Sequence, residues 1–369
     1  MNFIKLFIID RKQLKEVDFG IIIAAVLLLL FGALNISRAT GNGEGLSSYG
    51  RLQVLWLLVS LVVMYIILLM DYRMVYKMVD VLYWITVVLL VIVLATGKVK
   101  GAAGWFSIGQ RGFQPAEFAK LTTMLMLGKK LHQNEGNLNN IPNFVSTAIY
   151  ALIPMILMML QPDMGLTMVT FFITLGIFFS VGLSMKVIGS GFGFIAVAVG
   201  FVLNTDFLPS HWKARLSSFL FEEGSDLGIN YQLTQSIISI GSGKMTGSST
   251  PGFYSRVPEN HTDFIFAVVA ENFGFIGGLV LLFLYGFIMY RMVSIAKSTE
   301  DIFGKCIAVG VFSIFLFSVL QNVGMTMGLM PISGITLPLV SYGGSSVLTT
   351  FIALGMVLNV GMKRKTTLF

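Results

Sequence analysis

Long apolar runs separated by short polar segments dominate this chain. Each run is about 20 residues long with few charges, which is enough to cross a hydrocarbon core of about 30 Å as an α-helix. In lipid the backbone must be hydrogen-bonded within the segment, so a spanning run is expected to be helical. The pattern predicts ten spans, at 19–38, 53–70, 79–96, 116–131, 143–160, 166–183, 187–204, 262–290, 304–325 and 341–361. The sequence therefore predicts an all-α integral membrane protein, with residues 1–369 forming a single polytopic membrane domain.

Composition agrees with lipid as the solvent. The chain is 55% hydrophobic and 12% charged, whereas soluble domains carry roughly 25% charged residues. The net charge of +7 is spread singly and in pairs between the apolar runs, which indicates charge placement across a membrane rather than a nucleic-acid surface. Cys306 is the only cysteine, so disulfides within the chain and cysteine-based metal sites are excluded. The first apolar run, near Phe19, is too long for a cleaved signal peptide and is interpreted as the first span.

The basic residues also predict an orientation. With ten spans both termini lie on one side. If that side is the cytoplasm, 15 of the 25 Lys and Arg residues fall in inside segments, 9 fall in outside segments, and Lys120 falls within a span. Because inside loops of membrane proteins are enriched in Lys and Arg, both termini are expected to be cytoplasmic.

Two of the outside segments are longer than simple turns. One covers 97–115, and the other covers about 205–261, before the eighth span, with a Gly/Ser-rich run at 241–252. Connections of this length are uncommon unless they are functional or disordered. We therefore expect a large extracytoplasmic loop with a role in function.

Charged residues near the membrane mark candidate site positions, because charges at bilayer depth are costly and usually functional or internally paired. Glu117 and Lys120 lie three residues apart at the start of the fourth span, on one helix face. They fit either a site or a structural ion pair. Asp163, between two spans, fits either a site or a helix cap.

The polar stretch before the eighth span holds a further carboxylate. Asp263 is expected at or next to a helix N-terminus near the outer membrane surface, where it is either a cap or a reactive group, and Thr262 is an alternative cap. Glu271 follows eight residues later, within about 80° on the helical wheel. His261 is a possible base, although a lone histidine is more often structural.

Together these residues describe an external site for an anionic amphiphile. Arg111 and Lys120 suit phosphate, a carboxylate suits proton abstraction from a sugar hydroxyl, and Trp105 suits a sugar face or the membrane interface. The residue pattern alone does not name the substrate.

Five ordered motifs resemble the SEDS family, the shape, elongation, division and sporulation proteins that include RodA and FtsW. The resemblance runs from about residue 19 to 361. The motifs are KGAAGWFSIGQRGFQPAEFAK (100–120), QPDMG (161–165), NYQLTQSIISIGSG (230–243), VPENHTDFIFAVVAENFGFIGG (257–278) and GLMPISGITLPLVSYGGSS (328–346). The family resemblance implies the same tenfold-spanning fold.

The resemblance also implies an activity: a peptidoglycan glycosyltransferase that polymerises lipid II, an undecaprenyl-diphosphate-linked disaccharide–pentapeptide, on the outer face of the bacterial cytoplasmic membrane. The aspartate of the family's HTDF motif, its presumed catalytic residue, corresponds to Asp263. The conserved charged positions correspond to Arg111, Glu117 and Lys120, and the aspartate of QPD corresponds to Asp163.

The chain departs from the family pattern at a few positions. Gly104 stands where many members have an arginine before the tryptophan, so a phosphate-binding cation is either missing or supplied by Lys98 or Lys100. Ala116 replaces the usual serine, and Asn272 replaces a second glutamate. The motifs and the short chain resemble the RodA branch, which acts in cell elongation and shape, more than the FtsW branch of cell division.

The resemblance leads to an expected mechanism. Asp263 takes the proton of the acceptor 4-hydroxyl as it attacks the donor anomeric carbon, undecaprenyl diphosphate leaves, and the configuration inverts. Arg111 and Lys120 stabilise the leaving group, with Mg²⁺ or Mn²⁺ bridging the phosphates. The expected partner, again by resemblance, is a class B penicillin-binding protein, and no nucleic acid is expected. Alternatives are a lipid II flippase and a non-catalytic membrane scaffold.

Overall fold

The structure, a computed structural model, describes residues 11–41, 45–95, 104–108, 111–184, 189, 227–249 and 257–363. Within these residues the chain is almost entirely helical. The helices are α1 (Arg11–Leu14), α2 (Phe19–Thr40), α3 (Ser48–Leu69), α4 (Tyr72–Ala95), α5 (Pro115–Gln133), α6 (Ile141–Leu160), α7 (Met164–Ser180), α10 (Leu227–Ser242), α11 (Ile265–Lys297), α12 (Ile302–Thr326) and α13 (Gly344–Lys363).

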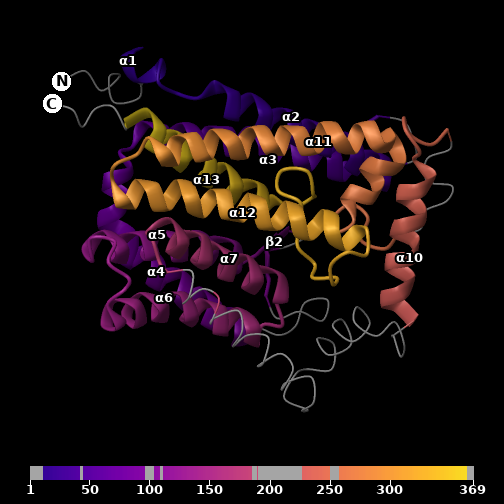
Figure 1. The fold of residues 1–369 in the computed structure, drawn as a ribbon. Helices are drawn as coiled ribbons and strands as arrows, with labels where there is room; N and C mark the ends of the chain where they lie inside the picture. The colour runs from indigo at the N-terminus through magenta and orange to yellow at the C-terminus, as the bar shows by residue number, and fades with distance from the viewer. Residues whose placement is uncertain are drawn as a thin grey trace.

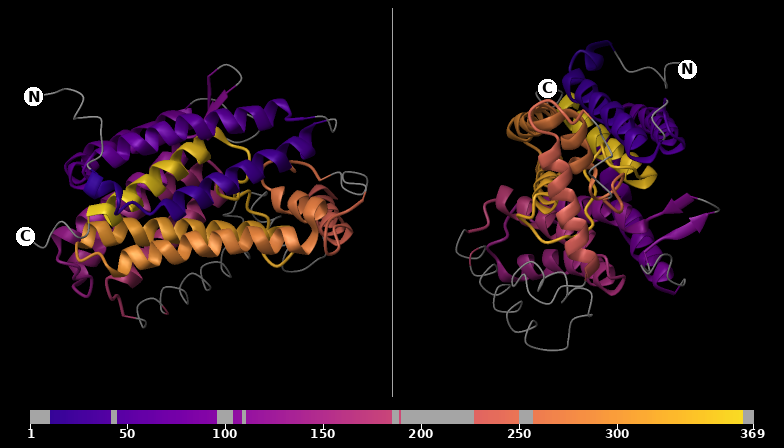
Figure 2. Two further views of the ribbon diagram at one scale, coloured as in Figure 1. Left: turned by 90° about the horizontal axis from the view of Figure 1, so that it is seen from above. Right: turned by 90° about the vertical axis from the view of Figure 1, so that its right-hand side faces the viewer.

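The long helices run side by side and form one bundle (Figures 1 and 2). Helix α13 packs on α3, and α12 packs on α5, α7 and α11. Within the most apolar window of each helix, 72% of α12 and 83% of α13 is buried, against 28% of α3 and α6. Helices α12 and α13 therefore form the centre of the bundle, and α3 and α6 lie at its periphery.

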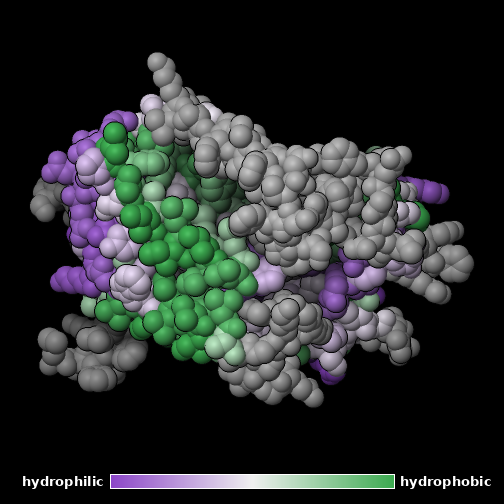
Figure 3. Space-filling model, turned by 90° about the horizontal axis from the view of Figure 1, so that it is seen from below, coloured by the Kyte–Doolittle hydropathy of each residue, from purple (hydrophilic) through white to green (hydrophobic). Residues whose placement is uncertain are grey.

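The periphery is apolar, as a surface facing lipid must be. Seven of the described helices are long and apolar enough to cross a membrane. Helix α6 exposes one stripe at helical spacing, formed by Val145, Ile149, Leu152 and Ile156. Seen from the side on which α6 lies, an apolar surface is bordered by hydrophilic residues at the end of the bundle that carries the termini (Figure 3).

Nine of the ten predicted spans are helices in the structure, which confirms the predicted fold class. The predicted span at 187–204 lies outside the described residues. The largest differences in the boundaries, seven residues each, are at the start of α4 and the end of α11. Helix α4 begins at Tyr72 rather than at 79, and the backbone amide of Tyr72 donates to Asn359 Oδ1 (3.2 Å) of α13. Helix α11 continues beyond 290 to Lys297, because its last turns pack against the bundle, where Met292 and Ile295 are buried.

Both long outside segments contain regular structure that the sequence did not predict. In the segment 97–115, β1 (Phe106–Ile108) pairs antiparallel with β2 (Arg111–Phe113), Phe106 opposite Phe113. The chain is therefore not wholly helical. Strands β1 and β2 have three residues each, which is too few to cross a membrane. Their backbone groups form hydrogen bonds with each other. In the large loop, α10 lies across the end of the bundle, transverse to the long helices (Figure 1).

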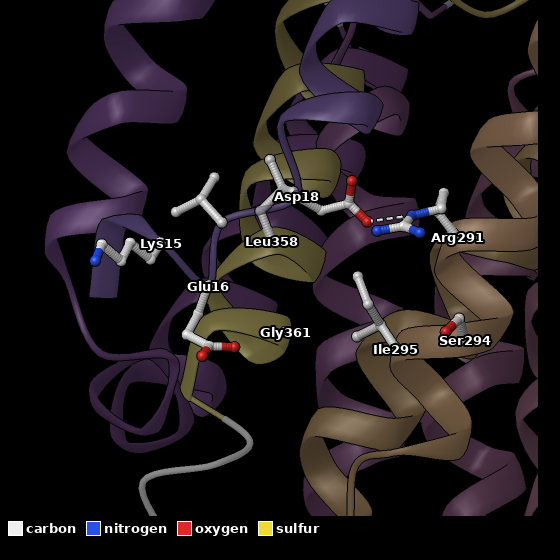
Figure 4. Close-up of a pocket in the computed structure, with 9 residues that line it drawn as sticks. Lys15, Glu16, Asp18, Arg291, Ser294, Ile295, Leu358 and Gly361 are labelled. Carbon is white, nitrogen blue, oxygen red and sulfur yellow. Dashed lines mark hydrogen bonds and ion pairs between the residues drawn. The ribbon is translucent and has the colours of Figure 1, made fainter. Parts of the chain in front are cut away.

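The opposite end of the bundle carries α1 and the last turn of α13, so the described ends of the chain lie together (Figure 1). A crevice of about 180 Å³ opens there between α2, α11 and α13. Asp18 caps α2 by accepting from the Gly20 amide (3.1 Å) and also binds Arg291 Nε (2.5 Å). The Lys15 side chain is directed away from this ion pair (Figure 4). None of the predicted site residues lines this crevice.

Candidate active site

The start of α5 carries a buried ion pair. Pro115 occupies the first helical turn and Glu117 lies in the same turn, where a carboxylate is favoured by the helix dipole. Lys120 Nζ lies 2.7 Å from Glu117 Oε2, and the side chains are 7% and 5% exposed. Thr349 Oγ1 of α13 donates to the same Glu117 oxygen (2.8 Å). The predicted pairing is therefore confirmed, and the pair is joined to the central helix α13.

Asp163 caps α7, as one of the two interpretations of the sequence proposed. Its Oδ1 accepts from the Leu166 amide (3.0 Å), and its Oδ2 accepts from Gln114 Nε2 (2.9 Å). Asp163 lies in the turn between α6 and α7, outside both helices. Desolvation in this turn raises the pKa of the Asp163 carboxyl above its usual range, and the charge of Glu117 adds to the rise. Gln114 thus ties the start of α5 to the start of α7.

Asp263 does not occupy the capping position of α11. The capping position is Phe264, which makes no side-chain capping bond. Thr262, the alternative cap, donates to the Glu259 carbonyl instead (3.1 Å). The half-buried Asp263 therefore lies just before the capping position of its helix rather than at it. This observation distinguishes Asp263 from Asp163.

The backbone around Asp263 is fixed by the segment 327–343, which connects α12 to α13. Asn322 Nδ2 donates to the Asp263 carbonyl (2.7 Å) and to the Ile335 carbonyl (2.7 Å). Ser341 Oγ donates to the Thr262 carbonyl (2.7 Å), and the Tyr342 amide donates to the His261 carbonyl (2.9 Å). The segment 261–263, just before α11, is therefore held in place by α12 and by the connection 327–343.

The same connection lies between Asp263 and the start of α7. A Cβ atom built on Gly334 would lie 3.5 Å from Asp263 Oδ2, so the carboxylate faces this backbone. A Cβ atom on Gly165 would lie 2.9 Å from Ile335 Cγ1 and 3.0 Å from the Ser333 carbonyl. Residues 333–335 therefore contact the carboxylate on one side and the start of α7, next to Asp163, on the other.

Other predicted residues lie near this region or outside the described part of the chain. Trp105 is exposed, and its ring packs so closely on Gly112 that a Cβ there would lie 2.7 Å from it. Arg111 belongs to β2 opposite Ile108, but its side chain is outside the described atoms. Lys98 and Lys100 lie outside the described residues.

His261 and Glu271 have structural contacts. The His261 ring lies 5.1 Å from that of Tyr49 and 6.0 Å from that of Tyr342, as expected for the structural interpretation. Glu271 is buried, and Ser239 Oγ of α10 donates to its Oε2 (2.8 Å). Helix α11 begins at Ile265, so Asp263 lies before the helix. The predicted helical-wheel angle between Asp263 and Glu271 is therefore wrong.

Three residues of the site were not predicted: Gln114, Asn322 and Thr349. Each binds a carboxylate or the backbone beside one. The sequence does carry one signal for Asn322, which is that it and Gln321 are amide side chains inside a largely apolar span. Among the described residues, no group of three or more His, Cys, Asp and Glu residues that could hold a metal ion is present.

The fold and the site together define a polytopic membrane protein with a polar site at the end opposite its termini. The profile of the cell cycle protein family FtsW/RodA/SpoVE matches residues 13–366. The chain therefore belongs to this family, which the sequence motifs indicated as the SEDS family.

Individual relatives agree over almost the full length. The chain is 33% identical to the peptidoglycan glycosyltransferase MrdB of Escherichia coli, covering 95% of both chains. It is 32% identical to stage V sporulation protein E of Bacillus subtilis, covering 93% of this chain and 96% of that one. Among solved structures, RodA of Thermus thermophilus matches with a TM-score of 0.72 at 28% identity, covering 95% of this chain and 98% of that one.

A second structural neighbour is a chain of a peptidoglycan synthase complex that coordinates polymerization and crosslinking. It matches with a TM-score of 0.81 at 28% identity, again covering 95% of this chain and 98% of that one.

Proposed function

We propose that this chain, a peptidoglycan glycosyltransferase of the SEDS family similar to RodA and MrdB, polymerises lipid II with inversion of configuration. The single observation that carries the residue assignment is the environment of Asp263. Asp263 lies just before the capping position of α11, and hydrogen bonds from Ser341 to the Thr262 carbonyl and from Asn322 to the Asp263 carbonyl fix the backbone there. A carboxylate on a backbone held in this way is preorganised, which supports its proposed role as the base.

In the proposed reaction Asp263 accepts one proton. The 4-hydroxyl oxygen of the acceptor GlcNAc forms a bond to the anomeric carbon of the donor MurNAc as Asp263 takes the hydroxyl proton. The bond from that carbon to the diphosphate oxygen breaks, and undecaprenyl diphosphate leaves with the electron pair. One displacement at the anomeric carbon inverts its configuration.

The leaving diphosphate requires positive charge, because negative charge accumulates there in the transition state. Lys120 and Arg111 are our candidates. Glu117 holds Lys120 through one contact, and an ammonium group has three donors, so Lys120 keeps donors for phosphate oxygens. The role of Glu117 is then to orient Lys120. The proposed roles of Lys98, Lys100 and Trp105 in holding the substrate rest on their place in the segment 97–115 alone.

An apolar cavity below this pair fits an isoprenoid tail. It has a volume of about 230 Å³ and lies between α3, α4, α5 and α13. Its lining begins at Phe118, next to Glu117 in sequence, and continues along α5 through Leu121 and Leu125. A polar group above an apolar cavity on one helix matches an amphiphile with a charged head and a hydrocarbon chain. We place part of the undecaprenyl chain of the substrate here.

A divalent cation is part of the proposal. Magnesium sites on phosphate substrates commonly use only one or two protein carboxylates, the remaining ligands being phosphates and water. The described residues fit such a site but not a cage made by protein alone, since no cluster of three acidic, His or Cys ligands is found among them. Asp163, which Gln114 ties to the start of α5, is our candidate ligand. The metal would neutralise charge on the diphosphate. Polymerisation that survives chelation would exclude it.

The proposed orientation places the termini in the cytoplasm and the site at the outer face. The two described ends of the chain lie at one end of the bundle, and the excess of basic residues belongs to that side. The proposed partner is a class B penicillin-binding protein, a transpeptidase, since a structural neighbour comes from a complex that couples polymerization to crosslinking.

The test is polymerisation of lipid II by purified protein in detergent with Mg²⁺ or Mn²⁺. Asp263→Ala and Asp263→Asn should lose activity by a factor of about 10² to 10⁴, the usual contribution of a general base. Glu259→Gln is a matched control, because Glu259 is an exposed carboxylate four residues earlier in the same segment, and it should keep wild-type activity. Wild-type turnover by Asp263→Ala would overturn the assignment. A flippase would give no glycan strands in this assay and would move lipid II only in sealed vesicles.

A further inference from the structure

Helix α11 is broken eleven residues after Asp263. Gly274 has φ 64° and ψ −161° inside the helix, a conformation that is essentially restricted to glycine. The break separates a half-helix, residues 265–273, from the long remainder of α11. In Figure 1 the half-helix turns away from the long part of α11 at the end of the bundle where α10 lies. Asp263 lies directly before this half-helix.

A break leaves backbone groups without their helical partners, and here another segment binds them. In a regular helix the amide of Phe275 would donate to the carbonyl of Glu271. Instead, the Phe275 amide donates to the Lys244 carbonyl (2.9 Å), and the Ile276 amide donates to the Met245 carbonyl (3.1 Å). The Glu271 carbonyl in turn accepts from the Ser248 amide (2.8 Å). Residues 243–248, which we name the strap, therefore complete the hydrogen bonds of α11 across its break.

The strap approaches α11 at distances that only glycine permits. A Cβ atom on Gly243 would lie 1.8 Å from the Ala270 carbonyl oxygen, and one on Gly247 would lie 2.2 Å from the Asn272 carbonyl oxygen. A Cβ atom on Gly274 itself would lie 2.4 Å from the Met245 carbonyl carbon. These contacts account for the described part of the Gly/Ser-rich run, residues 241–249, for which the sequence left a functional or a disordered loop open. It is an ordered backbone contact.

Helix α10, which leads into the strap, is anchored on the same half-helix. Ser239 Oγ donates to Glu271 Oε2 (2.8 Å), and Ser236 Oγ donates to the Thr326 carbonyl at the end of α12 (2.8 Å). Both serines are fully buried, whereas Ile237 and Ile238 are exposed. The polar face of α10 therefore points into the protein, and it holds the half-helix between α10 and the bundle.

We propose that the strap is a positioning element of the active site: by completing the backbone of α11 at Gly274 it fixes the half-helix 265–273, and with it the carboxylate of Asp263. This inference rests on the proposed role of Asp263 as the base. The strap touches neither the substrate nor the reacting atoms. It acts through the half-helix, and it makes the large outer loop part of the catalytic machinery.

Gly274→Ala tests the strap directly, because the new Cβ would strike the Met245 backbone and the alanine would have to leave the glycine-only conformation. We expect kcat for lipid II polymerisation to fall about 10²-fold, the cost of misplacing a reacting group by about 1 Å, while KM stays within about twofold. Hydrogen exchange should lose protection at Ser248, Phe275 and Ile276 and keep it in the long part of α11. Gly286→Ala is the matched control, because a Cβ there meets nothing within 4 Å, and it should match the wild type in every measurement.

A second variant separates positioning from general damage. Gly247→Ala should break the same contact from the strap side, so the double variant with Gly274→Ala should be no less active than the worse single variant. The proposal would be overturned if the losses of kcat in the two single variants multiply in the double variant, or if Gly274→Ala has the kcat of the wild type. Asp263→Ala should keep full protection at the three amides while losing activity. If Asp263→Ala is active and the three amides still depend on Gly274, the proposed base is wrong and the strap contact stands without its catalytic role.

Discussion

The two ends of the bundle handle charge in opposite ways. At the end with the termini, charged residues form ion pairs between helices, and in each pair at least one side chain is substantially exposed. These pairs are Asp18–Arg291, Asp80–Lys129, Asp71–Lys363 and Asp301–His132. At the other end, the pair of Glu117 and Lys120 is buried on both sides, and Asn322 and Ser341 fix the backbone at Asp263 and Thr262. The first arrangement joins helices at a wet surface, whereas the second holds groups in fixed positions away from water.

This difference suggests what each end is for. An exposed ion pair contributes little to stability, and its loss disturbs little around it. Buried polar groups cost free energy unless every partner is in place. We therefore expect the end opposite the termini to tolerate fewer changes, as the preorganisation that catalysis requires would imply.

The largest effect is expected when the buried pair is broken. Lys120→Met leaves Glu117 as a buried carboxylate without its cation and should cost about 3–5 kcal/mol of stability. Lys363→Met breaks an ion pair at the opposite end, whose Asp71 side chain is 35% exposed, and should cost no more than about 1 kcal/mol. Thermal unfolding of both variants in detergent measures the contrast. Equal losses would contradict the proposed difference between the two ends.

A double variant separates stability from chemistry at this pair. Glu117→Gln combined with Lys120→Met removes both charges and should recover most of the stability that Lys120→Met loses, because no buried charge remains. Polymerisation should stay absent if Lys120 binds the diphosphate. Recovery of activity together with stability would remove Lys120 from the site.

Next in size is the loss of a helix cap. Asp163 caps α7 near the site, and Asp301 caps α12 at the opposite end, where its Oδ2 accepts from the Gly304 amide (2.8 Å). Asp163→Ala and Asp301→Ala should each cost about 1 kcal/mol, the usual value of a cap. Only Asp163→Ala should also reduce polymerisation, because it releases Gln114 and the start of α5. Similar activity losses in both variants would show that capping alone explains the effect.

The sequence predicted the helices well and the site only in part. Apolar runs of spanning length predicted nine of the helices, because backbone groups in lipid must be hydrogen-bonded within their own segment. The pairing of Glu117 with Lys120 followed from a three-residue spacing, which is local. By contrast, the contact of Gly334 with Asp263 and the insertion of the strap into α11 join residues 71 and about 30 positions apart along the chain. Rules based on residue spacing within a helix or strand do not predict contacts at such sequence separations. A glycine in a loop also does not indicate which backbone segment it will approach.

A pH dependence should test the buried environment of Asp163 at the site end. Burial raises the pKa of Asp163 in the folded protein above its value in the unfolded chain. A group of this kind contributes stability that is fully present below the unfolded pKa of about 3.9 and is lost as the pH rises through the folded pKa. The wild type should therefore lose stability relative to Asp163→Asn as the pH rises from about 4. Asparagine still caps the helix, so a stability difference that does not change with pH would contradict the raised pKa.

The smallest effect is expected at the ion pair between Asp18 and Arg291. The Arg291 side chain is 43% exposed, so water replaces its contact at little cost, and Arg291→Ala should change stability by no more than about 1 kcal/mol. Asp18 keeps its bond to the Gly20 amide in this variant, so α2 remains capped. Polymerisation should equal that of the wild type, because the crevice lies at the end of the bundle opposite Asp263. A loss of polymerisation comparable to that of Asp163→Ala would mean that the two ends are coupled through α11, which carries Arg291 near one end and follows Asp263 at the other.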